Sequence, residues 1–251
     1  MNRDELVTYL DDYLQIGTIE DRSNNGLQVE GADEVTRVAF AVDAGLAAFE
    51  GAQAAGAQML IVHHGLFWGE PLPVTGIHRR RLGYLFDSGL SLYAAHLPLD
   101  FHDKVGNNIT LACWLGLEDV VPFGNYNGRP AGVFGRLPQA VPLEQLAARV
   151  EETLGQAVVR IWPFGPAVVQ RVGIASGGGS FLIDQVAKMG ADAYLTGEMS
   201  HNVYHRVREL GLNVIYGGHY ATETAGLKAL AEHLEVRFGL ETAFVDLPTG
   251  A

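Results

Sequence analysis

Two eight-residue segments of this chain carry the same arrangement of side chains that could bind metal. Both consist of an aromatic residue, two small residues, a histidine, three further residues and a carboxylate; they are Tyr93–Asp100 and Tyr216–Glu223. A third segment that could bind metal is the adjacent pair His63-His64, which follows the apolar run Met59–Val62. Side chains that come directly after buried strands gather at one edge of an α/β sheet, where such proteins place their chemistry. The pattern therefore predicts a site for two metal ions.

The predicted ligands are one histidine pair and two carboxylates with a further histidine: His63, His64, Asp100, His219 and Glu223. Two ions in one site usually share a carboxylate, and the longer side chain of Glu223 makes it the candidate bridge. Asp100 with one histidine of the pair would hold one ion, and His219 with the other histidine would hold the second. Hard carboxylates beside imidazoles suit zinc, manganese or iron(II). Two such ions acidify water, which makes hydroxide available at neutral pH.

Each of these groups also has an ordinary structural interpretation. The histidine pair could be two loop residues, one buried and one solvated. His219 and Glu223 lie four positions apart, so they could form a polar pair on a helix surface. Asp100 could cap a helix. His96 is either a sixth ligand or a neighbour that holds Asp100, and we favour the second role.

Further polar groups follow strands in the second half of the chain. The glycine-rich segment Ser176–Ser180 could hold a phosphate through its backbone amides, but it lacks the lysine of a Walker loop, and we favour a tight turn between strand and helix. Glu198 and His201 follow the next strand, and they could act as an acid, a base or contacts to a substrate. Alternatively, Glu198 and His201 have only a structural role at the capped start of a helix. Cys113 and Trp114 are expected in the core.

Composition restricts the class of protein. The formal net charge of −12 disfavours direct nucleic-acid binding, which needs basic surface. Cys113 is the only cysteine, and the first residues lack the apolar core of a signal peptide, so we expect a cytoplasmic protein. No apolar stretch is long enough for a membrane span, so no membrane partner is expected.

Short apolar strands alternate with amphipathic helices along the chain, which predicts the α/β class with parallel βαβ units. Val35–Val42 is a strand of this kind, and Ala44–Ala55 is the helix that follows it. The segment Pro122–Pro130 is dense in turn formers and is the best internal boundary. We therefore expect a first α/β lobe over residues 1–125 and a second over 126–251, with the last helix able to pack on the first lobe.

The two halves of the chain are related in sequence. Arg37–His64 aligns without gaps on Arg171–Glu198, and six positions are identical. A second alignment, shifted by 11 residues, pairs the two histidines and the two carboxylates of the repeated arrangement. The alignment predicts an internal duplication that gives two similar lobes related by a pseudo-twofold axis.

Five motifs occur along the chain in a specific order: Ser23-Asn24-Asn25-Gly26-Leu27-Gln28, His63-His64-Gly65-Leu66-Phe67-Trp68, His96-Leu97-Pro98-Leu99-Asp100, Thr196-Gly197-Glu198 and Gly218-His219-Tyr220-Ala221-Thr222-Glu223. Together they resemble the Nif-three-like family, whose bacterial members carry the label GTP cyclohydrolase 1 type 2 homologs. The resemblance implies a dinuclear site built by the five ligands named above. It also implies two three-layer α/β/α lobes with the metal site in the cleft between them, and a homohexamer that is a trimer of dimers.

Two functions from different classes follow. The first is a dinuclear metal-dependent hydrolase acting on a small anionic substrate; the family label suggests a nucleotide, GTP, whose guanine ring would be opened at C8. The ligands alone suit a phosphoester or an amide equally well. The second is a non-catalytic protein that binds metal for delivery or regulation, or serves as a scaffold. A metal site that keeps a coordination position open would favour the enzyme.

Overall fold

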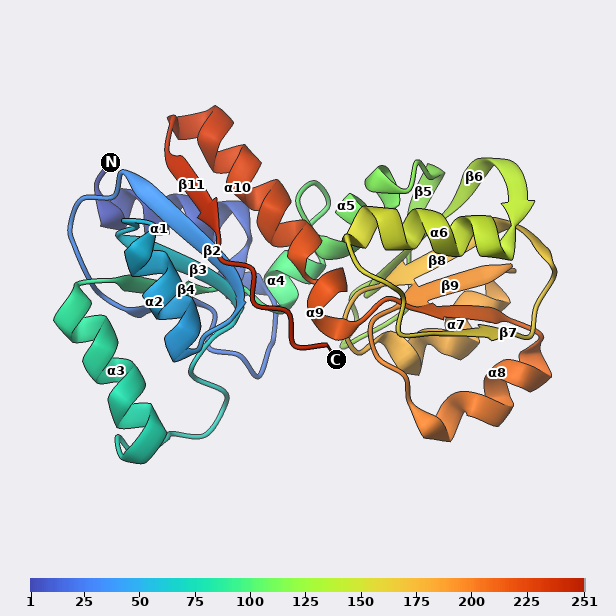
Figure 1. Ribbon diagram of the computed structural model, residues 1–251, viewed down its shortest axis with the longest axis horizontal. Helices are drawn as coiled ribbons and strands as arrows, with labels where there is room; N and C mark the ends of the chain where they lie inside the picture. Colours follow the sequence, from blue (N-terminus) through green and yellow to red (C-terminus); the bar gives the residue numbers. More distant parts are fainter. Residues whose placement is uncertain (251) are drawn as a thin grey trace. The chain divides into compact units, whose positions relative to one another are not determined.

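The structure, a computed structural model, describes residues 1–250 and divides them into two compact units. Unit 1 comprises Met1–Val105 and Gly226–Leu247, and unit 2 contains Gly106–Ala225. Each unit has its own sheet (Figure 1). Each also has its own cluster of buried hydrophobic residues. Because the chain leaves unit 1 and later returns to it, unit 1 is built from two separate stretches of sequence.

The sheet of unit 1 has five strands in the order β1-β4-β3-β2-β11. The strands are β1 (Gly26–Val29), β2 (Arg37–Asp43), β3 (Met59–His64), β4 (Ser91–Ala94) and β11 (Glu241–Phe244). Strands β4, β3, β2 and β11 are parallel, and β1 pairs antiparallel with β4. The predicted parallel βαβ units are therefore confirmed in this half, with one antiparallel strand added at the edge.

Helices cover both faces of this sheet. They are α1 (Arg3–Tyr13), α2 (Leu46–Ala54), α3 (Gly76–Ser88), the single turn α4 (Leu97–Asp100) and α10 (Thr224–Phe238); a short 3-10 turn, η1, spans Ile16–Thr18. Helices α2 and α3 bury Phe49 and Leu85 against strand residues such as Leu60. On the other face, Tyr93 donates a hydrogen bond to Asp11 of α1. Helix α10 lies beside α1, where the ring of His233 stacks on that of Tyr13, and the two helices complete the third layer.

The sheet of unit 2 has six strands in the order β5-β6-β8-β9-β10-β7. The strands are β5 (Glu118–Phe123), β6 (Gly132–Pro142), β7 (Arg160–Pro163), β8 (Val168–Ala175), β9 (Ala193–Thr196) and β10 (Asn213–Tyr216). Strands β8, β9 and β10 are parallel, while β6 and β7 add antiparallel to the two sides of this trio. The carboxyl ends of the parallel strands carry the polar segments of this half.

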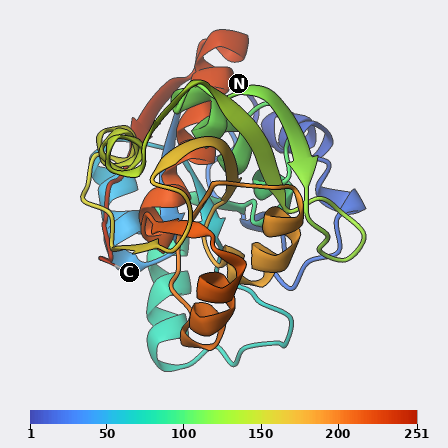
Figure 2. The ribbon, with the colours of Figure 1, turned by 90° about the vertical axis from the view of Figure 1, so that its right-hand side faces the viewer.

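Helices also cover both faces of the second sheet. They are α5 (Asn107–Trp114), α6 (Leu143–Leu154), α7 (Ile183–Lys188), α8 (Tyr204–Leu210) and the single turn α9 (His219–Thr222), with 3-10 turns η2 (Gly179–Leu182) and η3 (His201–Val203). Helices α5 and α6 pack on the face that carries Val172, Leu195 and Ile215. Figures 1 and 2 show α6 and α8 on opposite sides of the sheet. Each unit is thus a three-layer α/β/α lobe, as predicted.

A shared hydrogen-bonding device supports the internal duplication. In unit 1, Oε1 of Gln58 accepts the backbone N–H groups of Thr36 and Arg37, both at 3.0 Å. In unit 2, Oδ2 of Asp192 accepts those of Gln170 and Arg171, at 3.0 and 2.8 Å. Gln58 and Asp192 occupy equivalent positions in the sequence alignment of the halves. The same junction between a helix and two parallel strands is therefore built twice.

The boundary between the units differs from the predicted one. The turn-rich segment Pro122–Pro130 connects β5 to β6, which pair with each other in the second sheet. The units divide after Val105 instead, and α10 with β11 belongs to unit 1. Turn formers marked a hairpin here, because tight turns inside a sheet use the same residues as linkers do.

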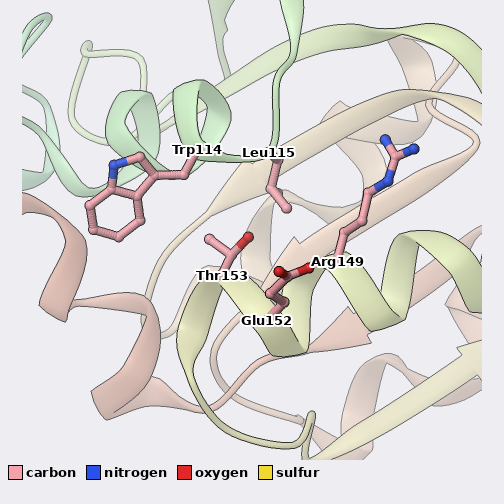
Figure 3. A pocket seen from close by; sticks show the side chains of 5 residues that line it. All are labelled: Trp114, Leu115, Arg149, Glu152 and Thr153. Atoms are coloured by element: carbon pink, nitrogen blue, oxygen red, sulfur yellow. The ribbon is translucent and has the colours of Figure 1, made fainter.

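Trp114 is 43% exposed and Cys113 is exposed, so the expectation that both lie in the core is wrong. Trp114 lines a surface hollow with Leu115 and with Arg149, Glu152 and Thr153 of α6 (Figure 3). None of the predicted site residues lines this hollow. Within residues 1–250, no helix is long and apolar enough to cross a membrane.

Two buried tyrosines of unit 2 provide a matched stability test. The hydroxyl of Tyr194 donates to the carbonyl oxygen of Gly179 at 2.8 Å, whereas the hydroxyl of Tyr216 has no hydrogen-bond partner within residues 1–250. We expect Tyr194→Phe to lower the free energy of unfolding by about 1–2 kcal/mol, because a buried carbonyl loses its donor. Tyr216→Phe should be neutral or stabilising. Urea denaturation checks both, and a larger loss in Tyr216→Phe than in Tyr194→Phe would contradict the assignment.

Candidate metal centre

In unit 1, strand β3 ends in the two adjacent histidines. The sequence placed His63 and His64 just past this strand, but they are its last two residues. His63 is completely buried and His64 is partly exposed, and their ring centroids lie 4.7 Å apart. Nε2 of His63 lies 3.6 Å from Oδ2 of Asp100, which ends the single-turn helix α4. Three predicted ligands of this half are therefore neighbours.

Both histidines have their Nδ1 atoms tied to the protein. Nδ1 of His63 donates to the carbonyl oxygen of Ala95 at 3.0 Å, and since a carbonyl can only accept, this nitrogen carries the proton. Nδ1 of His64 lies 2.8 Å from Oδ1 of Asp43, at the end of the neighbouring strand β2. Fixing Nδ1 in this way leaves Nε2 as the nitrogen that can bind metal.

His96 has the same kind of anchor. Its Nδ1 lies 3.0 Å from both carboxylate oxygens of Asp21. Burial, the largest single influence, raises the pKa of Asp21, but hydrogen bonds from His96 and Asn25 and the charge of the imidazole together outweigh it and lower this pKa strongly. We expected the ring of His96 to hold Asp100, but the hydrogen bonds that its Nδ1 atom makes go to Asp21. His63, His64 and His96 offer ligand atoms within 4.8 Å of one another.

In unit 2, His219 begins the single-turn helix α9 and Glu223 directly follows it. Nε2 of His219 lies 3.0 Å from Oε1 of Glu223, and the Glu223 side chain is only 4% exposed. The hydroxyl of Thr222 accepts the backbone N–H of Gly177 and donates within its own turn, which fixes the helix on the glycine-rich loop. Spacing of four residues thus brings the imidazole and the carboxylate together, as the sequence predicts.

Glu198 lies on the other side of the same imidazole. Its Oε1 is 2.6 Å from Nδ1 of His219. Burial lowers the pKa of His219, but hydrogen bonds to Glu223 and Glu198 and the charges of both carboxylates outweigh it and raise this pKa to about 9. Glu198 is 54% exposed on its side chain. It therefore has the geometry to hold the ring while one face of the carboxylate meets solvent.

The glycine-rich loop of residues 176–180 supports these side chains and leaves little room for a phosphate. The backbone N–H groups of Gly177 and Gly179 donate to hydroxyls of Thr222 and Thr196, and that of Ser176 donates to Asn108. A Cβ at Gly177 would collide with the Glu223 carboxylate and lie 3.2 Å from Nε2 of His219. The backbone of this loop therefore packs closely against the Glu223 carboxylate.

His201 lies apart from these groups. It begins the 3-10 turn η3 and lines a surface hollow of unit 2 with Trp162, Met199 and Tyr204. Among residues 1–250, it belongs to none of the groups of side chains whose geometry suits a metal ion. A contact to substrate or proton transfer stays a prediction for this residue.

Two carboxylates in these clusters were missed in the sequence. Asp43 ends strand β2 directly beside His64, and its place at the carboxyl end of a buried strand was the available signal. Asp21 precedes the motif that starts at Ser23, in a stretch that has the composition of an ordinary polar turn. Both lie far in sequence from the histidines that they hold, so spacing alone does not reveal them.

Comparison with known proteins gives the family. The chain matches the family described as Duf34/NIF3 (NGG1p interacting factor 3) over residues 1–249. Proteins named "GTP cyclohydrolase 1 type 2 homolog" from Pyrococcus abyssi and Deinococcus radiodurans are 46% and 44% identical over 250 residues, covering 100% of this chain and 100% and 95% of those proteins. The protein of that name from Escherichia coli K12 is 40% identical over 252 residues and is fully covered.

Solved structures agree with this assignment. The structure of TTHA1606 from Thermus thermophilus is 50% identical with a TM-score of 0.90, and each chain is covered completely. A structural-genomics structure titled protein ybgI, of unknown function, is 40% identical with a TM-score of 0.93 and the same coverage. The predicted resemblance is confirmed: this chain is a member of the Duf34/NIF3 family.

Proposed function

We propose that the two clusters together bind two divalent metal ions and that the protein is a metal-dependent hydrolase. Unit 1 would contribute His63, His64 and Asp100, and unit 2 would contribute His219 and Glu223. The chemistry of this donor set fits zinc, manganese or iron(II), which accept imidazole nitrogen and carboxylate oxygen. The fit also rests on Gly177, since any larger residue would push the Glu223 carboxylate out of its place.

One observation carries the proposal. In both units the histidines that end strands or begin helices have Nδ1 bound to a protein oxygen, from Ala95, Asp43 and Glu198. This second layer of acceptors is what metal-binding histidines have, because it fixes the tautomer and orients Nε2.

A pair of divalent ions in such a site, when bound, lowers the pKa of water from about 15.7 toward roughly 7 and so supplies hydroxide at neutral pH. The chain's own groups do the rest. Asp43 and Glu198 keep the imidazoles oriented. Glu198, half exposed, and His201 are the residues proposed to accept and return protons.

The substrate proposed is a small anion, and the names of the relatives direct the first choice to GTP. Water would add to C8 of the guanine ring, a C8–N bond would break, and a proton would go to the departing ring nitrogen. The name of a relative does not establish this reaction for the present chain. A phosphodiester and an amide are therefore included in the test.

The test compares the metal-loaded protein with its Asp100→Asn variant on GTP, a phosphodiester and a small amide, with products separated by chromatography. We expect turnover of one class by the wild type and a loss of at least about 100-fold in the variant, which loses a charged ligand. Equal turnover by both proteins would indicate a contaminant. Two bound ions without turnover of any class would favour the alternative, a metal-binding protein for delivery, regulation or assembly.

The resemblance also implies a homohexamer, and we keep it as part of the proposal. Light scattering of the purified protein measures the mass directly. A mass close to six times 27.1 kDa is expected.

A further inference from the structure

The polar turn of residues 21–25 forms hydrogen bonds with both the ring and the backbone of His96. The carboxylate of Asp21, only 3% exposed on its side chain, accepts from Nδ1 of the His96 ring. The side-chain oxygen of Asn25 accepts the backbone N–H of His96 at 2.8 Å. Ring and backbone of His96 are therefore both held by a segment more than 70 positions earlier in the chain.

Asp21 is itself held rigidly. Besides the imidazole, it accepts the side-chain amide of Asn25 at 2.9 Å and the backbone N–H groups of Ser23 and Leu97 at 3.1 Å each. Four donors to one buried carboxylate leave it little freedom to turn. Burial of a carboxylate is unfavourable unless it is hydrogen-bonded and paired, and the imidazole of His96 is the partner that Asp21 has here.

The ring of His96 faces the two histidines of β3. Its centroid lies 5.0 Å from that of His63 and 5.6 Å from that of His64, and Trp68 packs against it edge-on at 4.9 Å. The three imidazoles offer ligand atoms within 4.8 Å of one another. Two zinc–imidazole bonds of about 2.0–2.1 Å span at most about 4.2 Å, so shifts of a few tenths of an ångström would complete a three-histidine group.

We propose that His96 is a third imidazole ligand of the metal held by unit 1, and that Asp21 is the residue that positions it. The carboxylate of Asp21 takes the proton of Nδ1, which directs Nε2 of His96 toward His63 and His64. Asn25 sets the backbone from which the ring projects. This inference rests on the metal binding in the proposed function and adds a ligand to the five predicted ones.

The inference explains a motif that no predicted ligand used. The stretch that begins at Ser23 has the composition of a turn, yet the side chains of Asn25 and Gln28 accept the backbone N–H groups of His96 and Leu66, which follow strands β4 and β3. The Asp21–His96 contact is the same device as the Asp43–His64 contact. Carboxylate partners of this kind typically contribute 10–100-fold to metal affinity.

The test measures metal binding and not turnover. Wild type, His96→Ala and Asp21→Asn are titrated with Co²⁺, and the visible absorption of the bound ion reports the number and kind of ligands. In Asp21→Asn we expect one of the two ions to bind about 10–100-fold more weakly. In His96→Ala, which loses the ligand itself, the loss of affinity should be at least as large, and both variants should show a changed band shape. His205→Ala, an exposed histidine of α8, is the matched control and should leave both ions unchanged.

Asp21→Asn also tests positioning separately from folding. An amide can present its NH₂ to Nδ1 and so shift the ring proton to Nε2, and ¹⁵N NMR of the imidazoles reports this tautomer in the metal-free protein. Unchanged Co²⁺ affinity and spectrum in His96→Ala, with weaker binding in His63→Ala, would overturn the role of His96 and leave the dinuclear proposal standing. A wild type that binds no Co²⁺ would overturn both.

Discussion

Replacing Glu223 by alanine is expected to remove both metal ions, lowering the content from near two per chain to near zero. Glu223 is proposed as the shared ligand, and its buried carboxylate lies 3.0 Å from Nε2 of His219. Loss of a bridge affects both ions, so affinity should fall by more than the roughly 10–100-fold that outer partners contribute. Elemental analysis of protein purified without chelator measures the content.

Two variants control this result. Glu232→Ala removes an exposed carboxylate from the next helix, α10, and should keep both ions. His63→Ala should weaken mainly one ion, because a terminal imidazole serves only one. Full occupancy in Glu223→Ala would show that this residue is not the bridge, and circular dichroism would establish that the variant is folded.

Gly177→Ala should damage the fold of unit 2 and the metal content together. Gly177 has φ of +55°, a left-handed conformation that costs a residue with a side chain about 1–2 kcal/mol. The added Cβ would also strike the Glu223 carboxylate, and forced overpacking costs typically about 1–3 kcal/mol. Together these two costs should lower the free energy of unfolding by about 2–5 kcal/mol, with metal content reduced even in the folded fraction.

The chain offers controls that separate the two causes. Gly76 has φ of +53° with nothing within 4 Å of a Cβ, so Gly76→Ala carries only the backbone cost. At Gly178 a Cβ would meet Glu198 at an ordinary 3.8 Å, and Gly178→Ala should change stability little. If Gly177→Ala were no worse than Gly76→Ala in urea denaturation and kept its metal, the contact with Glu223 would be unimportant.

Strands that are buried on both faces were the most predictable elements. Continuous apolar runs between turn formers, such as Ala193–Thr196 and Asn213–Tyr216, have few alternatives to a buried strand, and the structure has strands with these bounds. Strand β5 was missed, since it is mostly exposed and contains Asp119 at φ of +51° as well as Pro122. The single turn α4 contains Pro98, which is frequent in loops but which the first turn of a helix also tolerates.

The metal ligands could be predicted from the sequence, whereas the residues that hydrogen-bond to those ligands could not. The histidines and carboxylates recur at one spacing after apolar runs, so local sequence identifies them. Asp21 meets His96 across 75 positions, and that contact depends on how β1 pairs with β4. Local pattern contains no information on such pairing. A sequence pattern that identifies the ligands of a site therefore does not identify the residues that orient them.

The discontinuity of unit 1 has a consequence for synthesis on the ribosome. The 120 residues from Gly106 to Ala225 emerge before the segment that finishes unit 1. At about 5–20 residues per second, synthesis of these 120 residues alone takes roughly 6–24 seconds, during which strand β2 lacks its neighbour β11. During that interval its edge presents unsatisfied N–H and C=O groups, a hazard for aggregation. The nascent chain is thus most vulnerable after its first sheet has formed and before its last strand arrives.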